Sequence, residues 1–369
     1  MSTSPIRWGI LGTANIARKN WQAIHLSGNG VVTAVASRDR GRAERFIAEC
    51  QSSVPVPLPP RAVGSYAELL ESPDVDAVYV PLPTGLRRDW VIRAARAGKH
   101  VVCEKPCAPS LADLEAMTAA CAENGVQFMD GVMFVHTGRM ERIRALVAER
   151  TTLGEVRRVT TQFSFNGDAH FFSENMRLHS AMEPQGCLGD LGWYSITFAL
   201  EAFEGRMPQS VSGRILSSFH HPGSPEPVPT EFSAELSYEG GVTSAFYNAF
   251  ITENQQWAHV SGAHGSLSVR DFVLPFVGCE SVFEVDRPEF HLQGCRFDME
   301  SHARRVAVPE HGNNHPTAQE TRLFRHFAAQ VASGSLNPDW PLRALKTQRI
   351  MDACLASARD GGRPVLLEG

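Results

Sequence analysis

The sequence predicts an α/β protein of two domains, with a doubly wound parallel sheet in the first and a mainly antiparallel sheet in the second. From Ile6 to about Gly131, short apolar runs alternate with amphipathic stretches, which is typical of parallel strands joined by crossover helices. After about Gly138, runs with strand periodicity follow one another directly, and Gly240-Gly241 between two of them indicates a hairpin. A chain of 369 residues can form two separate cores.

The first domain, residues 1–131, is predicted to alternate strands with helices. Its last helix has Ser110 as N-cap and Gly125 just after its end. The proline-rich stretch 54–60 is expected to be a surface loop. The predicted strands are 6–11, 31–37, 77–81, 100–103 and 127–129, and the predicted helices are 16–24, 40–50, 89–97 and 111–124.

The second domain, residues 132–369, is predicted to build a sheet with helices before and after it. Strands such as 242–250 carry apolar residues that one covering layer does not bury, so we expect a homo-oligomer, a dimer in the simplest case. The predicted strands are 156–165, 211–217, 231–238, 242–250, 259–262 and 266–270, and the predicted helices are 139–149, 190–202, 318–332 and 342–359.

Composition and charge exclude several classes of protein. Hydrophobic residues make up 43% of the chain and charged residues 20%, which argues against disorder and against a membrane protein. The net charge of -5 gives no reason to expect nucleic acid or an anionic membrane as partner. The N-terminus enters the first strand without a basic and apolar leader pattern, and no apolar stretch is long enough to span a bilayer. We therefore expect a cytoplasmic location.

Cysteine and histidine spacing predicts no metal site. The eight cysteines are scattered without a Cys-x-x-Cys pair, so reduced thiols are favoured over disulfides. His220-His221 and the segment 311–315 are polar loops that have no cysteine or carboxylate at ligand spacing.

A nucleotide motif follows the first strand. Gly12-Thr13-Ala14-Asn15-Ile16-Ala17 is a Gly-x-Ala-x-x-Ala version of the dinucleotide fingerprint, in which the glycine allows a tight turn and free helix amides bind pyrophosphate. After the second strand, where an NAD site carries an acidic residue, the chain has Ser37-Arg38 and Arg42, which suit a 2'-phosphate. Asp39 could instead face the ribose. The motif therefore favours NADP, with NAD as the alternative.

Three further side chains suit proton transfer. Lys105 follows a buried strand, and Asp190 and Tyr194 lie four residues apart on one predicted helix face. Hydride transfer at a carbinol carbon requires a proton to move to or from its oxygen, and a phenol with a pKa near 10 is a poor base at neutral pH. An ammonium beside Tyr194 would stabilise the phenolate and polarise the substrate oxygen, while Asp190 orients the pair or binds a substrate hydroxyl.

Five segments resemble the glucose-fructose oxidoreductase / inositol dehydrogenase family, abbreviated Gfo/Idh/MocA. The resemblance covers essentially the whole chain, and its most specific element is Glu104-Lys105-Pro106. It implies an N-terminal Rossmann domain and a C-terminal α/β domain with a large, mainly antiparallel open sheet through which dimers or tetramers form. The segments are 12–17, Pro81-Leu82-Pro83-Thr84, 97–106, 129–134 and 186–194.

The resemblance also implies roles for individual residues. Lys105 matches the active-site lysine, and its bond to Pro106 is expected to be cis. Asp190 and Tyr194 match the second catalytic segment, with tyrosine as in the glucose-fructose oxidoreductase and dimeric dihydrodiol dehydrogenase branches, whose usual cofactor is NADP. Arg87 stands where many relatives have histidine and receives no role. The cofactor is expected to contact the nucleotide-motif residues, Ser37, Arg38, Arg42, Glu104, Lys105 and the loop Pro81, Leu82, Pro83 and Thr84.

The sequence thus predicts an NADP-preferring oxidoreductase that moves a hydride reversibly between nicotinamide and a sugar, polyol, inositol or diol. Arg177 precedes the catalytic helix and is expected to anchor a substrate hydroxyl or carboxylate, or else to form a salt bridge at the rim. Two alternatives stay open: an NAD-dependent inositol or sugar dehydrogenase, and a non-catalytic relative that binds dinucleotide as a sensor or co-regulator.

Overall fold

The computed structural model describes residues 4–367, which form two compact units. Unit 1 contains the chain up to His136 together with the segments Ala181–Pro184 and Asn313–Gln348. Unit 2 contains Thr137–Ser180, Gln185–Gly312 and the chain from Arg349 on. Within residues 4–367, none of the helices is both long and apolar enough to cross a membrane.

Unit 1 is built on a six-stranded parallel sheet with the order β3-β2-β1-β4-β5-β6. The order reverses between β1 and β4, as in a doubly wound Rossmann sheet. Its strands are β1 (Ile6–Leu11), β2 (Gly30–Ala36), β3 (Arg61–Val63), β4 (Ala77–Val80), β5 (His100–Cys103) and β6 (Phe128–Asp130).

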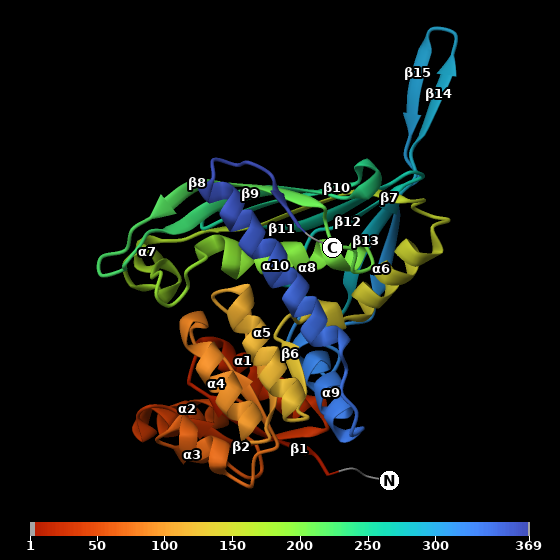
Figure 1. Cartoon of the computed structure of the whole chain (residues 1–369). Helices are drawn as coiled ribbons and strands as arrows, with labels where there is room; N and C mark the ends of the chain where they lie inside the picture. The colour runs from red at the N-terminus through yellow and green to blue at the C-terminus, as the bar shows by residue number, and fades with distance from the viewer. Residues whose placement is uncertain (1–3, 368–369) are drawn as a thin grey trace. The chain divides into compact units, whose positions relative to one another are not determined.

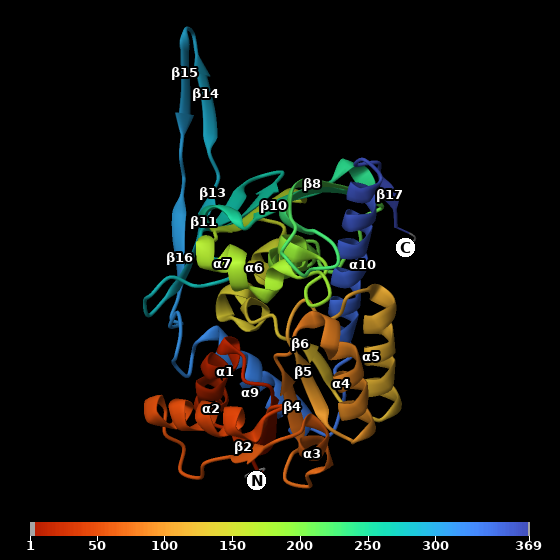
Figure 2. The same cartoon turned by 90° about the vertical axis from the view of Figure 1, so that its left-hand side faces the viewer.

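Helices cover both faces of this sheet. Figure 2 shows α1 and α9 on one side and α4 and α5 on the other. Trp8 of β1 is fully buried against Phe324 and Phe327 of α9, at ring-centroid distances of 5.1 and 5.3 Å. The helices are α1 (Asn15–Ser27), α2 (Arg40–Ser53), α3 (Tyr66–Glu71), α4 (Thr84–Arg96), α5 (Leu111–Glu123) and α9 (Gln319–Ala332).

Unit 2 contains a nine-stranded sheet with the order β16-β13-β12-β11-β7-β10-β9-β8-β17. All neighbours are antiparallel except β10 and β7, so the predicted mainly antiparallel sheet is confirmed. Its strands are β7 (Val156–Asn166), β8 (Ser210–Phe219), β9 (Val228–Ser237), β10 (Thr243–Ala249), β11 (Ile251–Gly262), β12 (Ser266–Val269), β13 (Ser281–Asp286), β16 (Arg304–Val308) and β17 (Val365–Leu366).

Helices cover one face of this second sheet. Figure 1 shows α6 (Gly138–Glu149) and α8 (Trp193–Ala202) on that face. The C-terminal part of α10 (Asp339–Arg359) packs closely on β8, because a Cβ at Gly213 would lie 2.2 Å from the Cys354 carbonyl oxygen. The short helix α7 (Ala169–Glu174) follows β7. We call the opposite face, which carries Gln162, Tyr247 and Trp257, the open face.

A separate two-stranded hairpin projects from unit 2 (Figures 1 and 2). Its strands are β14 (Glu289–Gln293) and β15 (Arg296–Glu300), and they connect β13 to β16.

The structure differs from the predicted elements in four places. Helix α4 begins at Thr84 rather than at residue 89, since the polar first turn hides the helical period. The predicted helix from Asp190 begins instead at Trp193, after a π-helical turn over Leu188–Gly192. Strand β11 begins at Ile251, well before the predicted 259. Within residues 4–367, eight short strands and α-helices were not predicted, namely β3, α3, α7 and β13 to β17.

Candidate active site

The nucleotide motif forms a tight turn at the carboxyl end of β1. Gly12 has φ +111°, and a Cβ at this position would lie 3.1 Å from the Leu82 side chain. Ala14 is the extended N-cap of α1 and supplies no side-chain oxygen to the first helical amides. The turn therefore needs glycine for its backbone, and it leaves helix amides available to an anion.

The end of β2 presents two arginines toward a tyrosine. Ser37 is buried, whereas Arg38 and Arg42 are exposed and form no ion pair within residues 4–367. Burial raises the pKa of the Tyr66 phenol, and the positive charges of Arg38 and Arg42 partly offset that rise. Both guanidinium groups are thus exposed just after the strand, where a 2'-phosphate is expected.

Asp39 has a structural task at the same place. Its carboxylate accepts a hydrogen bond of 2.9 Å from the Gly41 N–H and caps α2. An N-cap aspartate satisfies a helix amide and complements the helix dipole. Asp39 therefore has a role in the fold that does not depend on a bound cofactor.

A buried arginine joins the two loops predicted to meet the cofactor. Arg87, 5% exposed, donates from Nε to the Leu82 carbonyl at 2.6 Å and from Nη1 to the Glu104 carbonyl at 2.9 Å. The same Nη1 also donates to the Pro106 carbonyl. We call this set of contacts the Arg87 clamp. It fixes the backbone on both sides of Lys105, whose bond to Pro106 is cis, as the resemblance implied.

Glu104 and Thr84 are held by further buried contacts. The Tyr79 hydroxyl donates to Glu104 Oε1 at 2.6 Å, and burial together with that carboxylate raises the pKa of Tyr79 well above its usual range, which keeps the donor protonated. Thr84 is fully buried, and Glu183 accepts from its N–H at 3.0 Å and from its hydroxyl at 2.6 Å. Thr84 Oγ1 also donates to the Pro106 carbonyl at 3.3 Å.

In unit 2 the structure brings two predicted substrate residues together. Arg177 Nε donates to Asp190 Oδ2 at 2.9 Å, with the arginine side chain 43% exposed and the aspartate 12% exposed. Asp190 lies in the π-helical turn, and such turns are frequent at functional sites. Tyr194 lies in the first turn of α8, half-buried, with its ring edge-on to Phe163 at a centroid distance of 5.7 Å.

Glycines make the π-helical turn possible through close packing. Gly186 has φ +50°, and a Cβ there would lie 2.2 Å from the Pro229 carbonyl oxygen. A Cβ at Gly192 would lie 2.9 Å from Leu188 and 3.1 Å from Asn248. Both of these glycines therefore face protein atoms.

The structure therefore divides the predicted residues between two units. Unit 1 carries the nucleotide motif, the two arginines, the loop 81–84 and Lys105, and unit 2 carries Arg177, Asp190 and Tyr194. Sequence reasoning missed Arg87, Glu183 and Tyr66. The only signal for Arg87 was its departure from the family's histidine, and Glu183 lies 99 residues from the threonine that it binds.

Family models match both halves of the chain. Residues 6–132 match the oxidoreductase family with an NAD-binding Rossmann fold, and residues 140–268 match the GFO/IDH/MocA C-terminal domain. A dTDP-3,4-didehydro-2,6-dideoxy-alpha-D-glucose 3-reductase from Actinomadura kijaniata is 30% identical over 97% of both chains. A trans-1,2-dihydrobenzene-1,2-diol dehydrogenase from Mus musculus is 30% identical over 77% of this chain and 80% of its own.

Solved structures show the same architecture. A 3-ketoreductase from Actinomadura kijaniata in complex with TDP-benzene and NADP superposes with a TM-score of 0.80 at 28% identity, covering 96% of this chain and 98% of the other. The protein in that crystal has a tyrosine replaced by phenylalanine. In other crystals of the same 3-ketoreductase, a lysine is replaced by alanine or by glutamate.

Proposed function

The chain belongs to the GFO/IDH/MocA family of oxidoreductases, and we propose that it catalyses NADP-dependent, reversible hydride transfer at a carbinol or carbonyl carbon of a polyhydroxylated compound. The substrate class is a sugar, sugar derivative, inositol, other polyol or vicinal diol. Relatives that reduce a dTDP-linked keto sugar or oxidise a dihydrodiol support this class.

The cofactor assignment depends on Arg38, just after β2, and on Arg42, in the first turn of α2, which form no ion pair within residues 4–367. The 2'-phosphate of NADP is a dianion that charge-assisted hydrogen bonds from Arg38 and Arg42 would hold. Asp39 accepts from the Gly41 N–H through Oδ1 and so also has a role in capping α2. The free amides at the start of α1 suit the pyrophosphate.

Lys105 and Tyr194 are the proposed proton-transfer pair. When bound, NADP(H) supplies or accepts the hydride. The Tyr194 hydroxyl gives a proton to the carbonyl oxygen in reduction and removes it in oxidation, and the Lys105 ammonium stabilises the phenolate form. The replaced lysine and tyrosine in crystals of the Actinomadura relative support this pairing.

Asp190 and Arg177 are proposed to bind the substrate as one unit. The bond between Arg177 Nε and Asp190 Oδ2 holds the two groups side by side. A carboxylate accepts hydrogen bonds from sugar hydroxyls, and a guanidinium donates to hydroxyl oxygens. Two adjacent hydroxyl groups of a diol or sugar can donate to the carboxylate with one hydroxyl and accept from the guanidinium with the other.

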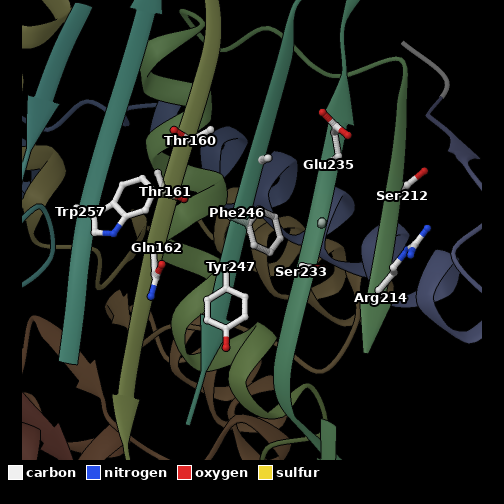
Figure 3. A pocket seen from close by; sticks show the side chains of 12 residues that line it. Thr160, Thr161, Gln162, Ser212, Arg214, Ser233, Glu235, Phe246, Tyr247 and Trp257 are labelled. Atoms are coloured by element: carbon white, nitrogen blue, oxygen red, sulfur yellow. The ribbon is translucent and has the colours of Figure 1, made fainter. Parts of the chain in front are cut away.

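We further propose a homodimer formed through the open face of the nine-stranded sheet. A hollow of about 510 Å³ lies on this face. Figure 3 shows Tyr247, Trp257, Gln162 and Arg214 among the side chains that line it. Aromatic and arginine side chains of this kind are enriched at protein interfaces.

A cofactor-coupled absorbance screen of sugars, polyols, inositols and diols, each with NADP and NAD, tests the proposed function. In the same assay, Arg38→Ala should weaken NADP binding by roughly 10- to 150-fold, the effect of losing a charge-assisted contact of about 1.5–3 kcal/mol, and leave NAD binding almost unchanged. Arg45→Ala is the matched control, because Arg45 is an exposed arginine of α2 whose Nη2 lies 4.0 Å from Asp39 Oδ2. Equal losses of affinity for NADP and NAD would contradict the assignment of Arg38 to the 2'-phosphate. Absence of turnover with every compound of the panel would contradict the proposal that the protein is an enzyme.

A further inference from the structure

The hairpin β14–β15 is amphipathic across its two faces. Strand pairing sets Phe290 opposite Met299 and Leu292 opposite Phe297, which places these four apolar side chains on one face. The other face carries polar and charged side chains, namely Glu289, His291, Gln293, Arg296, Asp298 and Glu300. Such alternation is typical of a strand pair with one buried face.

In the single chain, however, this apolar face is exposed. The exposed fractions are 57% for Phe290, 61% for Leu292, 69% for Phe297 and 68% for Met299. The Phe290 and Phe297 rings lie at a centroid distance of 6.0 Å from each other. An isolated two-stranded hairpin is marginally stable in water, and a cluster of exposed apolar side chains marks an interaction surface.

The hairpin stands beside the open face. It continues from β13 and β16, the two strands at one edge of the nine-stranded sheet. Figure 1 shows it rising on the side of the sheet away from α6 and α8, and Figure 2 shows the same direction after a quarter turn. A second copy stacked on the open face would lie alongside this hairpin.

We propose that the hairpin is a dimerisation arm, which packs Phe290, Leu292, Phe297 and Met299 against a second copy of this chain. The inference rests on the dimer through the open face, because the arm projects on that side and its base is continuous with that sheet. In a twofold dimer the contact occurs twice. Each phenylalanine can bury on the order of 150–250 Å², so two arms add a substantial share of a standard interface of roughly 1,600 Å².

Paired variants on the two faces of the arm test this proposal. Leu292→Ser with Phe297→Ser removes one cross-strand apolar pair, and Gln293→Ser with Arg296→Ser alters the neighbouring pair on the polar face. Sedimentation equilibrium should show that the first variant dissociates at least tenfold more readily than the wild type, and that the second stays within about twofold. NADP binding should be unchanged in both, since the arm is outside the nucleotide motif. Equal dimer stability in both variants would overturn the arm.

Cross-linking identifies what the arm contacts. Cys295 is an exposed thiol in the turn of the hairpin, so a photoreactive maleimide can be attached there in a Cys279→Ser background. In a mixture of ¹⁴N and ¹⁵N protein, cross-linked peptides that join light and heavy chains support the arm. If the protein is a dimer but yields only cross-links within one chain, the proposed role of the hairpin is wrong, whereas the proposed dimer through the open face still stands. A monomeric wild type would contradict both the dimer and the role of the hairpin. The hydride-transfer proposal is tested separately, by measuring turnover.

Discussion

The two units hold their candidate functional residues by different means. In unit 1, the backbone around Lys105 is fixed by buried polar contacts: the Arg87 clamp, the Tyr79–Glu104 hydrogen bond and the Glu183–Thr84 pair. In unit 2, Asp190 and Tyr194 belong to a π-helical turn and the helix after it, and tight packing at Gly186 and Gly192 makes that turn possible.

This difference teaches where each unit is sensitive to substitution. A buried hydrogen-bond network fails when one partner is removed, because the remaining polar groups lose their solvation without compensation. A closely packed turn fails when a side chain is enlarged, because backbone must move. Catalysis should depend on a few atoms in both units. Stability, in contrast, should depend on hydrogen-bond partners in unit 1 and on side-chain volume in unit 2.

The largest expected effect concerns the reacting atoms themselves. Tyr194→Phe should lower kcat by roughly two to four orders of magnitude, because only the proton-transferring hydroxyl is lost, while NADP affinity stays the same. Steady-state kinetics and a fluorescence titration with NADPH measure the two quantities. Tyr247→Phe, which also removes one hydroxyl, serves as the control. Normal turnover in Tyr194→Phe would mean that another group carries the proton, with Lys105 the first to examine.

The next effect concerns the polar network of unit 1. Arg87→Leu removes the guanidinium donor from the buried carbonyls of Leu82, Glu104 and Pro106. It should lower the free energy of unfolding by about 2–4 kcal/mol and kcat by roughly tenfold or more. Urea titration and kinetics at low temperature measure both. Arg88→Leu, at the exposed neighbour, should cost no more than about 1 kcal/mol. A clamp variant as stable and active as that control would refute this account of the loop.

A smaller effect is expected from the ion pair of unit 2. Arg177→Gln and Asp190→Asn should each raise KM by up to about tenfold and change kcat less, because the pair is partly exposed and binds substrate rather than transferring the proton. If the two residues act as one unit, the double variant should be no worse than the more damaging single variant. Additive losses in a double-mutant cycle would show that they bind the substrate independently.

The smallest effect is a pH dependence of stability at the start of β5. Burial lowers the pKa of His100, an effect that the charge of Asp76 partly offsets, and the neutral ring accepts a hydrogen bond of 2.9 Å from the Gln127 N–H at Nδ1. The stabilisation is therefore complete above the unfolded pKa of about 6.5 and is lost as the pH falls toward the lower folded value. Urea titrations from pH 7.5 to 5.5 should show a steeper decline for the wild type than for His100→Asn. Parallel curves would exclude His100 as the cause.

Buried, local patterns were the part of this molecule that sequence could predict. Strands β1, β4 and β5 are mostly apolar because both faces of a parallel sheet are covered, and they were found nearly to the residue. The hairpin β14–β15 was missed although it alternates regularly, since it is short and its apolar face has no counterpart in its own unit.

The contacts that fix the candidate site escaped prediction for a different reason. Arg87 binds backbone carbonyls, which every residue type supplies, so no partner residue signals the clamp. Gly186 has its conformation because of the Pro229 carbonyl, a neighbour that only the folded chain reveals. Residue types indicated which chemistry the site supports. How the backbone around those residues is held depends on tertiary contacts that residue types do not reveal.

The discontinuous course of unit 1 has a consequence for protein engineering. Its sheet depends on α9 for the cover over Trp8, and its loop 81–84 depends on Glu183, yet both come from chain beyond the last strand of the sheet. A fragment that stops at residue 136 would expose the Trp8 indole to solvent. It would also leave Thr84 without the Glu183 carboxylate that accepts its hydrogen bonds. A chimera that exchanges substrate specificity should therefore graft around the segments 181–184 and 313–348, rather than join two sequences at a single point.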